Sequence, residues 1–161
     1  MALQFFIPPK IMELEKEIHQ SKKFLHEKEK AAVNLMYTSN RHSEQMNEVF
    51  RRHSISSQQY NILRILKGQY PVPVSVKTIK ERMLDRMSDV SRLVERLNTK
   101  GYILRKECPE DRRNVDILIS DAGLEQLDII TPEVHARIEE VINLNTEELA
   151  TLNFLLDKLR G

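Results

Sequence analysis

Residues 89–101 read Asp-Val-Ser-Arg-Leu-Val-Glu-Arg-Leu-Asn-Thr-Lys-Gly, and residues 102–120 continue Tyr-Ile-Leu-Arg-Lys-Glu-Cys-Pro-Glu-Asp-Arg-Arg-Asn-Val-Asp-Ile-Leu-Ile-Ser. The first part predicts an amphipathic helix that ends at Gly101, because its apolar residues recur at i, i+3, i+4 and i+7, namely Val90, Leu93, Val94 and Leu97. After Gly101 the hydrophobic period changes to two. This change predicts one short strand over Tyr102–Glu107, a second over Val115–Ser120, and a loop between them.

The residues just before this stretch predict two further helices. Ser75 can cap a short helix over Val76–Met83, and a break near Leu84–Met87 separates it from the helix that ends at Gly101. Ser56 or Ser57 can cap an earlier helix that stops at Gly68, and the prolines at 71 and 73 then form an extended boundary. Two short helices followed by a hairpin, over residues 75–120, are typical of a winged helix-turn-helix.

The flanking segments are helical and carry apolar stripes that this small core is too small to cover. Residues 10–53 predict a long or broken helix, and the helical period returns at Asp121, with a kink or restart expected at Pro132. Asn145 and Glu148 form a capping-box pattern for a last helix. The two apolar stripes predict a partner surface, and therefore a dimer. The stripe of the last helix consists of Leu149, Leu152, Leu156 and Leu159, and the N-terminal stripe consists of Ile11, Leu14 and Ile18.

The predicted fold class is α+β and mostly α: a winged helix-turn-helix whose N- and C-terminal helices form an intertwined dimerisation domain. We expect residues 1–55 to hold the N-terminal dimerisation helices, 56–120 the winged core and 121–161 the C-terminal dimerisation helices. A length of 161 residues, of which 40% are hydrophobic, suits such a chain.

Composition excludes several functional classes. One cysteine excludes a disulfide within the chain and a multi-cysteine zinc site. No apolar run approaches the roughly 18 residues of a membrane helix, so we expect a cytoplasmic protein without a membrane partner. There is no GxSxG, P-loop or Rossmann glycine pattern, and no carboxylate pair stands out, so we expect neither an enzyme nor a cofactor.

The net charge of +1 conceals an uneven distribution. Residues 74–115 hold 11 Lys and Arg against 7 Asp and Glu, or 11 − 7 = +4, whereas residues 116–161 hold 3 against 10, or 3 − 10 = −7. A basic middle and an acidic C-terminal segment suggest different partners, although both also fit ordinary solvated faces.

The polar face of the helix that ends at Gly101 suits base reading. It holds Ser88, Ser91, Arg92, Glu95 and Thr99, with Asp89 and Arg96 at its edges. Serine donates or accepts hydrogen bonds, and arginine can grip the two acceptors of guanine, but a solvated helix face uses the same residue types. The loop favours DNA, because Asp111-Arg112-Arg113 at a hairpin tip suits a narrow minor groove, with Asp111 steadying an arginine.

Residues 89–101, Arg105, Asp111-Arg-Arg113 and Leu118-Ile-Ser-Asp-Ala-Gly123 together resemble the signature of MarR-type transcription regulators, the multiple antibiotic resistance regulators. The resemblance covers roughly Ser56 to the C-terminus. It implies a homodimeric repressor or activator that binds a pseudo-palindromic DNA operator, and we expect a repressor. Carried over by position, the resemblance implies DNA contacts from three places. These are the start of the helix at Ser57, the helix that ends at Gly101 with Ser88, Ser91, Arg92 and Arg96, and the wing with Asp111, Arg112 and Arg113.

Two features depart from the family pattern. Asp89 stands where a neutral, often hydroxyl, residue is usual; a carboxylate there can accept from cytosine but repels phosphate. The N-terminal extension, to about Lys30, is longer than usual, and its apolar stripe suggests extra dimer wrapping.

Other side chains suggest regulation. The family often binds phenolic or amphipathic effectors between its dimer helices and reading heads, where Tyr37, Arg41 and His53 could line a pocket or simply pack. Cys108 is either an ordinary loop thiol or a redox sensor activated by nearby arginines. The five histidines show no metal-ligand spacing. Two alternative functions remain open: a winged-helix protein-interaction module without DNA binding, and a redox or small-molecule sensor.

Overall fold

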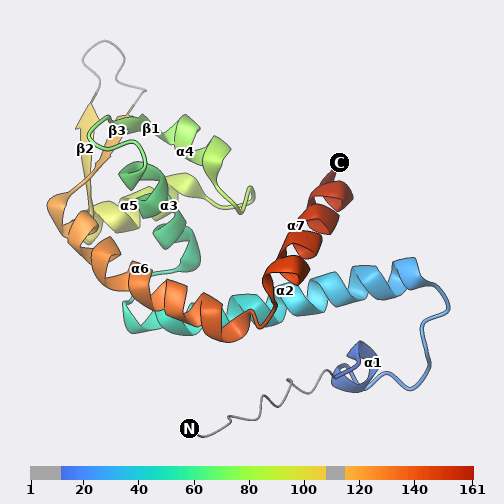
Figure 1. Ribbon diagram of the computed structural model, residues 1–161. Helices are drawn as coiled ribbons and strands as arrows, with labels where there is room; N and C mark the ends of the chain where they lie inside the picture. Colours follow the sequence, from blue (N-terminus) through green and yellow to red (C-terminus); the bar gives the residue numbers. More distant parts are fainter. Residues whose placement is uncertain (1–11, 108–114) are drawn as a thin grey trace, which may run out of the picture. The chain divides into compact units, whose positions relative to one another are not determined.

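The computed structural model describes residues 12–107 and 115–161 (Figure 1). The elements follow in the order α1 (Leu14–Glu17), α2 (Glu27–Arg52), α3 (Ser57–Lys67), β1 (Val74–Ser75), α4 (Val76–Arg82), α5 (Val90–Thr99), β2 (Ile103–Glu107), β3 (Val115–Ile119), α6 (Asp121–Val141) and α7 (Thr146–Arg160). They form two compact units, one from Glu44 to Ile138 and one from the remaining N- and C-terminal parts. We call these the winged unit and the terminal unit.

The winged unit contains a three-stranded antiparallel sheet in the order β1-β3-β2. β2 and β3 form the predicted hairpin, with Ile103 opposite Ile119 and Arg105 opposite Ile117. β1 pairs with the other edge of β3, Val74 opposite Ile117. The sequence predicted only an extended boundary at β1, because two residues next to prolines carry too little periodicity to show a strand.

The core of the winged unit lies where the helices meet this sheet. Ile62 and Leu63 of α3 are completely buried, as are Ile79 of α4 and Leu97 of α5, and Ile117 projects into the same cluster from β3. Ser56 begins α3 with a capping box, since its hydroxyl accepts from the Gln59 amide while the Gln59 side chain accepts from the Ser56 amide. Ser75 caps α4 through the Thr78 amide, as predicted.

Two glycines make the junction of α5, β2 and α6 possible. Gly101 has φ +75°, a left-handed conformation that glycine adopts without steric cost, and it ends α5. At Gly123 a Cβ atom would lie 2.2 Å from the Tyr102 carbonyl oxygen and 2.8 Å from Ile119 Cγ1. Ser120 ties the junction together, because its hydroxyl donates to the Gly101 carbonyl at 2.6 Å and accepts from the Gly123 amide at 3.1 Å.

The structure decides two helical expectations. α6 continues through Pro132, so the expected restart there is wrong. One missing N–H in a helix of 21 residues is tolerated when flanking residues such as Ile130 and Val134 are buried in the core. Of the long or broken helix expected over residues 10–53, the broken form is observed: between α1 and α2 the chain leaves the helical conformation, and Leu25 there is 87% exposed.

In the terminal unit, α1 packs beside α2. Leu14 is buried, and the Glu15 carboxylate accepts from Lys30 Nζ at 2.9 Å, which lowers the pKa of Glu15 and raises that of Lys30. The capping box predicted for α7 is present, with the Asn145 side chain accepting from Glu147 and Glu148 amides. α7 has no buried residue.

No helix within residues 12–107 and 115–161 is long and apolar enough to cross a bilayer.

We predict that Gly123→Ala lowers the free energy of unfolding by more than about 2 kcal/mol, because the new methyl group would overlap backbone. Urea unfolding followed by circular dichroism measures it. Gly68→Ala is the matched control: the added Cβ would lie 3.5 Å from its nearest neighbour and φ there is −68°, so stability should stay within about 1 kcal/mol of wild type. Equal losses in the two variants would contradict the close-approach argument.

Candidate nucleic-acid interface

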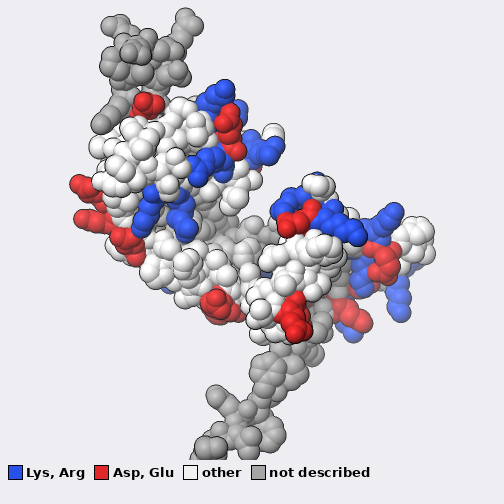
Figure 2. Space-filling model, turned by 45° about the horizontal axis from the view of Figure 1, so that its top comes forward, with Lys and Arg blue, Asp and Glu red and all other residues white. Residues whose placement is uncertain are grey.

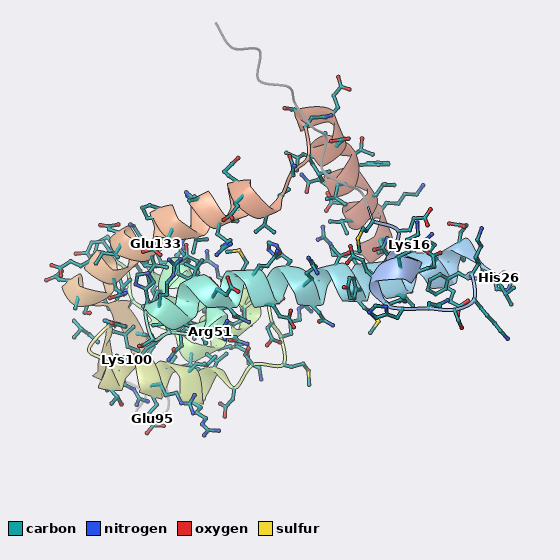
Figure 3. The ribbon with its side chains drawn as sticks, turned by 90° about the horizontal axis from the view of Figure 1, so that it is seen from below. Lys16, His26, Arg51, Glu95, Lys100 and Glu133 are labelled. Carbon is teal, nitrogen blue, oxygen red and sulfur yellow. The ribbon has the colours of Figure 1, made fainter. Side chains whose placement is uncertain are left out.

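α5 presents the polar face that the sequence predicted. Val90, Val94 and Leu97 are buried against the core, while Ser91, Arg92, Glu95 and Arg96 are exposed. Glu95 points away from the winged unit in Figure 3. Neither Arg92 nor Arg96 forms an ion pair with another described residue, so both guanidinium groups are accessible to a ligand on this face.

Asp89 has a structural role that the sequence analysis missed. It is the N-cap of α5, and its Oδ1 accepts a hydrogen bond from the Arg92 amide at 3.1 Å. The contact with cytosine considered from the sequence stays a prediction beside this structural role. The signal was available in the sequence, because aspartate is a preferred N-cap residue and Val90 begins the apolar period.

Ser88 lies before α5 and not on its face. Its hydroxyl donates to Asp85 Oδ2 at 2.9 Å, and the Met87 amide donates to Asp85 Oδ1 at 3.0 Å. These two donors lower the pKa of Asp85. The carboxylate is therefore ionised at neutral pH, and both bonds weaken only as the pH falls through this lowered pKa.

The turn between α4 and α5, residues 83–89, is also anchored to α3. The side-chain oxygen of Asn61 accepts from the Leu84 amide at 3.0 Å. Three polar side chains of the winged unit, Asn61, Asp85 and Asp89, thus satisfy backbone N–H groups before and at the start of α5. This arrangement fixes the entry of the helix that carries Ser91 and Arg92.

Several basic residues beside α5 were not singled out from the sequence. Figure 2 shows groups of Lys and Arg over the winged unit, interrupted by Asp and Glu. The exposed cations of α4 and of the turn that follows it are Lys77, Lys80, Arg82 and Arg86. Their spacing opposite Val76 and Ile79, inside the +4 segment, was the available signal.

The remaining predicted contacts are only partly placed. Ser57 is the first residue of α3, as expected, and its half-buried hydroxyl lies 3.3 Å from Gln58 Oε1. Asp111, Arg112, Arg113 and Cys108 lie outside the described residues, so their predicted roles stay predictions. Arg105 is exposed on β2, the strand that leads into the loop.

The expected effector residues fall into two groups. Tyr37 and Arg41 lie on α2 in the terminal unit and line a hollow of about 400 Å³ with Lys16, Glu17 and His19 of the α1 region. His53 is not among its lining residues; it belongs to the winged unit, where Nε2 lies 3.0 Å from Glu133 Oε1 and Arg52 binds the other oxygen at 3.1 Å. Glu133 is seen on α6 in Figure 3.

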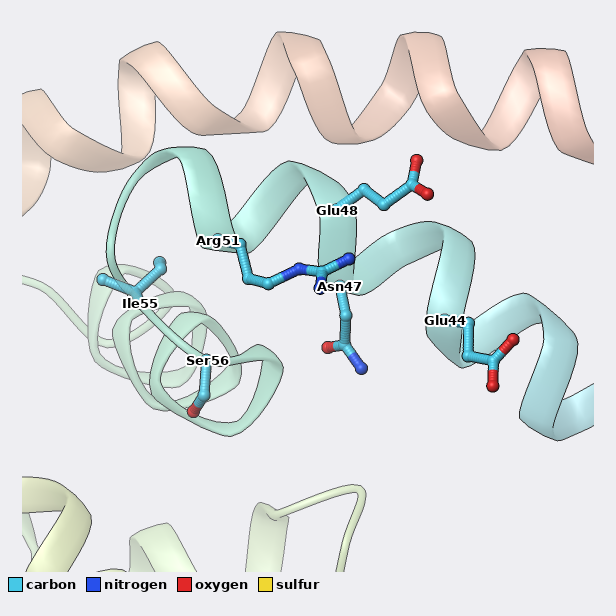
Figure 4. Close-up of a pocket in the computed structure, with 6 residues that line it drawn as sticks. All are labelled: Glu44, Asn47, Glu48, Arg51, Ile55 and Ser56. Carbon is cyan, nitrogen blue, oxygen red and sulfur yellow. The ribbon is translucent and has the colours of Figure 1, made fainter.

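A second hollow, of about 570 Å³, lies in the winged unit at the end of α2 (Figure 4). Glu44, Glu48 and Arg51 line it from α2, and Ile55 and Ser56 from the connection to α3. Its mixed charge favours no single ligand class. Among the described residues, no group of three or more His, Cys, Asp or Glu side chains could hold a metal ion.

Comparison with known proteins links this geometry to one family. The model of the MarR family matches residues 55–115, from the residue before the α3 cap to the start of β3. The HTH-type transcriptional regulator MgrA of Staphylococcus aureus is 31% identical over 116 residues, which cover 70% of this chain and 75% of MgrA. The chain belongs to the MarR family.

Solved structures agree with this assignment. The crystal structure of a MarR transcription factor from Planctomyces limnophilus is 32% identical, with a TM-score of 0.68 over 84% of this MarR-family chain and 98% of that one. A mutant MarR from E. coli, complexed with operator DNA, has the same TM-score of 0.68 over 93% of this chain and all of that one. At 20% identity the second comparison shows the fold alone. The resemblance noted from the sequence and the winged helix-turn-helix fold are confirmed.

We predict that Asp89→Ala destabilises this MarR-family chain by about 1 kcal/mol, because α5 loses its N-cap. Asp89→Ser keeps an acceptor and should retain most of the stability. Thermal unfolding of both variants checks this, and an Asp89→Ala variant as stable as wild type would show that the cap contributes nothing.

Proposed function

We propose that this MarR-family chain regulates transcription as a homodimer on a pseudo-palindromic operator, and that it acts as a repressor. The observation that carries the proposal is α5: a capped helix, buried along one side, that displays Ser91, Arg92 and Arg96 on the other. Its membership of a family of transcriptional regulators supports this function over a protein-interaction module without DNA binding. Because it acts on DNA, we expect it in the cytoplasm.

Each group on this face has a DNA contact that suits its chemistry. Arg92 can bind guanine O6 and N7 together, and Ser91 can donate to or accept from a base edge. Arg96 and the cations of α4 suit phosphates, which fix the register of the protein without reading sequence. Since Ser88 already donates to Asp85, we assign it to the turn and remove it from the base-reading set.

The terminal unit supplies the case for a dimer. Apolar side chains of α7 and of the segment before it are exposed in the single chain: Ile142, Leu144, Leu152, Leu155 and Leu159. A patch of this kind normally marks a protein interface. A two-fold dimer would also place two copies of α5 about 34 Å apart, one turn of DNA, which matches two half-sites.

Regulation by a small effector also belongs to the proposal. Aromatic Tyr37 and the cations Arg41 and Lys16 line the α1–α2 hollow together with Glu17, whose carboxylate lies 3.9 Å from Arg41, so this mixed lining suits an amphipathic effector. Binding there would change operator affinity by favouring one dimer conformation over another. A redox role for Cys108 is a separate candidate, and thiol reactivity at neutral pH tests it.

We predict that Arg113→Ala weakens binding to all duplexes and lowers the salt slope by about one, because one phosphate-region contact is lost. Arg92→Ala should instead cost about 1–3 kcal/mol on the operator and relax specificity at one or two base pairs. Fluorescence anisotropy at two salt concentrations, with operator and random duplexes, separates the two patterns.

The matched control is Lys158→Ala on α7, which removes one exposed positive charge from the terminal unit. It should keep both affinity and salt slope. If Arg113→Ala also leaves both unchanged, the wing assignment is wrong. If wild-type protein binds no duplex selected from a random pool even at low salt, the proposed function is wrong.

We predict that Leu152→Glu shifts the chain from dimer to monomer, because a carboxylate would be buried in the apolar interface. Sedimentation velocity measures the change. Ala150→Glu is the matched control: it lies two residues away, about 200° around the helix, and is exposed. Dimers in both variants, or a monomeric wild type, would contradict the proposed interface.

A further inference from the structure

The turn between α4 and α5 carries an unexplained apolar pair. Leu84 is 88% exposed and Met87 is 93% exposed, the largest values among the large apolar side chains of the winged unit that the structure describes. Both lie within a few residues of the N-terminus of α5. Neither contributes to the core, so their size and apolar character call for another role.

Their exposure does not come from a loose loop. The Leu84 amide donates to Asn61 Oδ1 at 3.0 Å, and the Met87 amide donates to Asp85 Oδ1 at 3.0 Å. Asp85 Oδ2 accepts from the Ser88 hydroxyl, and the Asp85 carbonyl accepts from the Ser88 amide at 3.3 Å. The backbone on either side of both side chains is therefore held, and the turn presents them outward.

The position of the pair beside α5 favours DNA as its partner. Arg82 and Arg86 are exposed beside the two apolar side chains, and the nearby carboxylates of Asp85 and Asp89 are held on backbone amides of the turn and of α5. In Figure 1 the turn projects from the winged unit and leads directly into α5. It thus lies next to Ser91 and Arg92, the residues proposed to enter the major groove.

In the major groove the apolar feature of the base edges is the C5-methyl group of thymine. We propose that Leu84 and Met87 contact thymine methyl groups, so that this turn selects T·A pairs beside the positions that Ser91 and Arg92 read. This inference rests on the proposed DNA-binding function. It adds a second determinant of specificity for the operator sequence to the contacts of Ser91 and Arg92. It assigns the apolar pair to specificity, while the neighbouring arginines supply attraction to phosphate.

Deoxyuridine gives a direct test, because it pairs with adenine as thymine does and lacks only the methyl group. Duplexes that bind the full-length chain are first selected from a random pool, and each thymine is then replaced singly by deoxyuridine. We expect at least one replacement in each half-site to weaken wild-type binding by about fourfold, the value of one buried methyl. The double variant Leu84→Ala/Met87→Ala should bind thymine and deoxyuridine duplexes equally.

Val72→Ala is the matched control, since Val72 is 61% exposed and lies between α3 and β1, outside the residues proposed for DNA contact and for the dimer. It should bind like wild type and keep the full deoxyuridine effect. The single variants Leu84→Ala and Met87→Ala then assign each methyl to one side chain, and unfolding curves that match wild type show that the turn is intact.

The outcomes separate this inference from the function on which it rests. If no deoxyuridine replacement weakens the wild type, or if the double variant keeps the same deoxyuridine effect, the thymine contacts are wrong while DNA binding stands. If no duplex is selected at all, both proposals fail.

Discussion

The winged unit depends on a close approach of backbone at the junction of α5, β2 and α6. The first turn of α6 comes so near the Tyr102 carbonyl that there is no room for a Cβ at position 123. Gly101, just before Tyr102, ends α5 in a left-handed conformation. The Ser120 hydroxyl then joins the Gly101 turn to α6, because it donates to the Gly101 carbonyl and accepts from the Gly123 amide. Helix α5, the β2–β3 hairpin and α6 therefore share one junction, and buried side chains of the core pack against it.

Before and at the start of α5, carboxylate and amide side chains accept hydrogen bonds from backbone N–H groups. Asp89 caps α5, Asp85 closes the turn before it, and Asn61 holds that turn to α3. The positive end of the α5 dipole also offsets the negative charge of the cap. Both carboxylates keep their negative charge, so the net charge of +4 over residues 74–115 stands, and their hydrogen bonds fix where those two charges lie.

The terminal unit follows a different principle. Its ion pairs, such as Glu15–Lys30, join α1 to α2, yet α7 exposes its apolar residues in the single chain. A helix of this kind is stabilised mainly by what covers it, and its capping box alone contributes only about 1 kcal/mol. We therefore assign its stability to the partner subunit of the proposed dimer.

The sequence by itself determined α3, α4, α5 and the hairpin of the winged unit, and the family that the chain resembles. The apolar spacing of α5, the change to period two after Gly101 and the capping serines are local patterns, and local patterns record which face each element buries. Only the tertiary structure decided that Val74 and Ser75 form a third strand, that α6 continues through Pro132 and that the Ser88 hydroxyl donates to Asp85. It also showed that Tyr37 and Arg41 line a hollow to which His53 does not contribute. The physical reason is that strand pairing, helix continuity past a proline and the contents of a hollow depend on residues far apart in the chain, and a single sequence carries no direct record of those contacts.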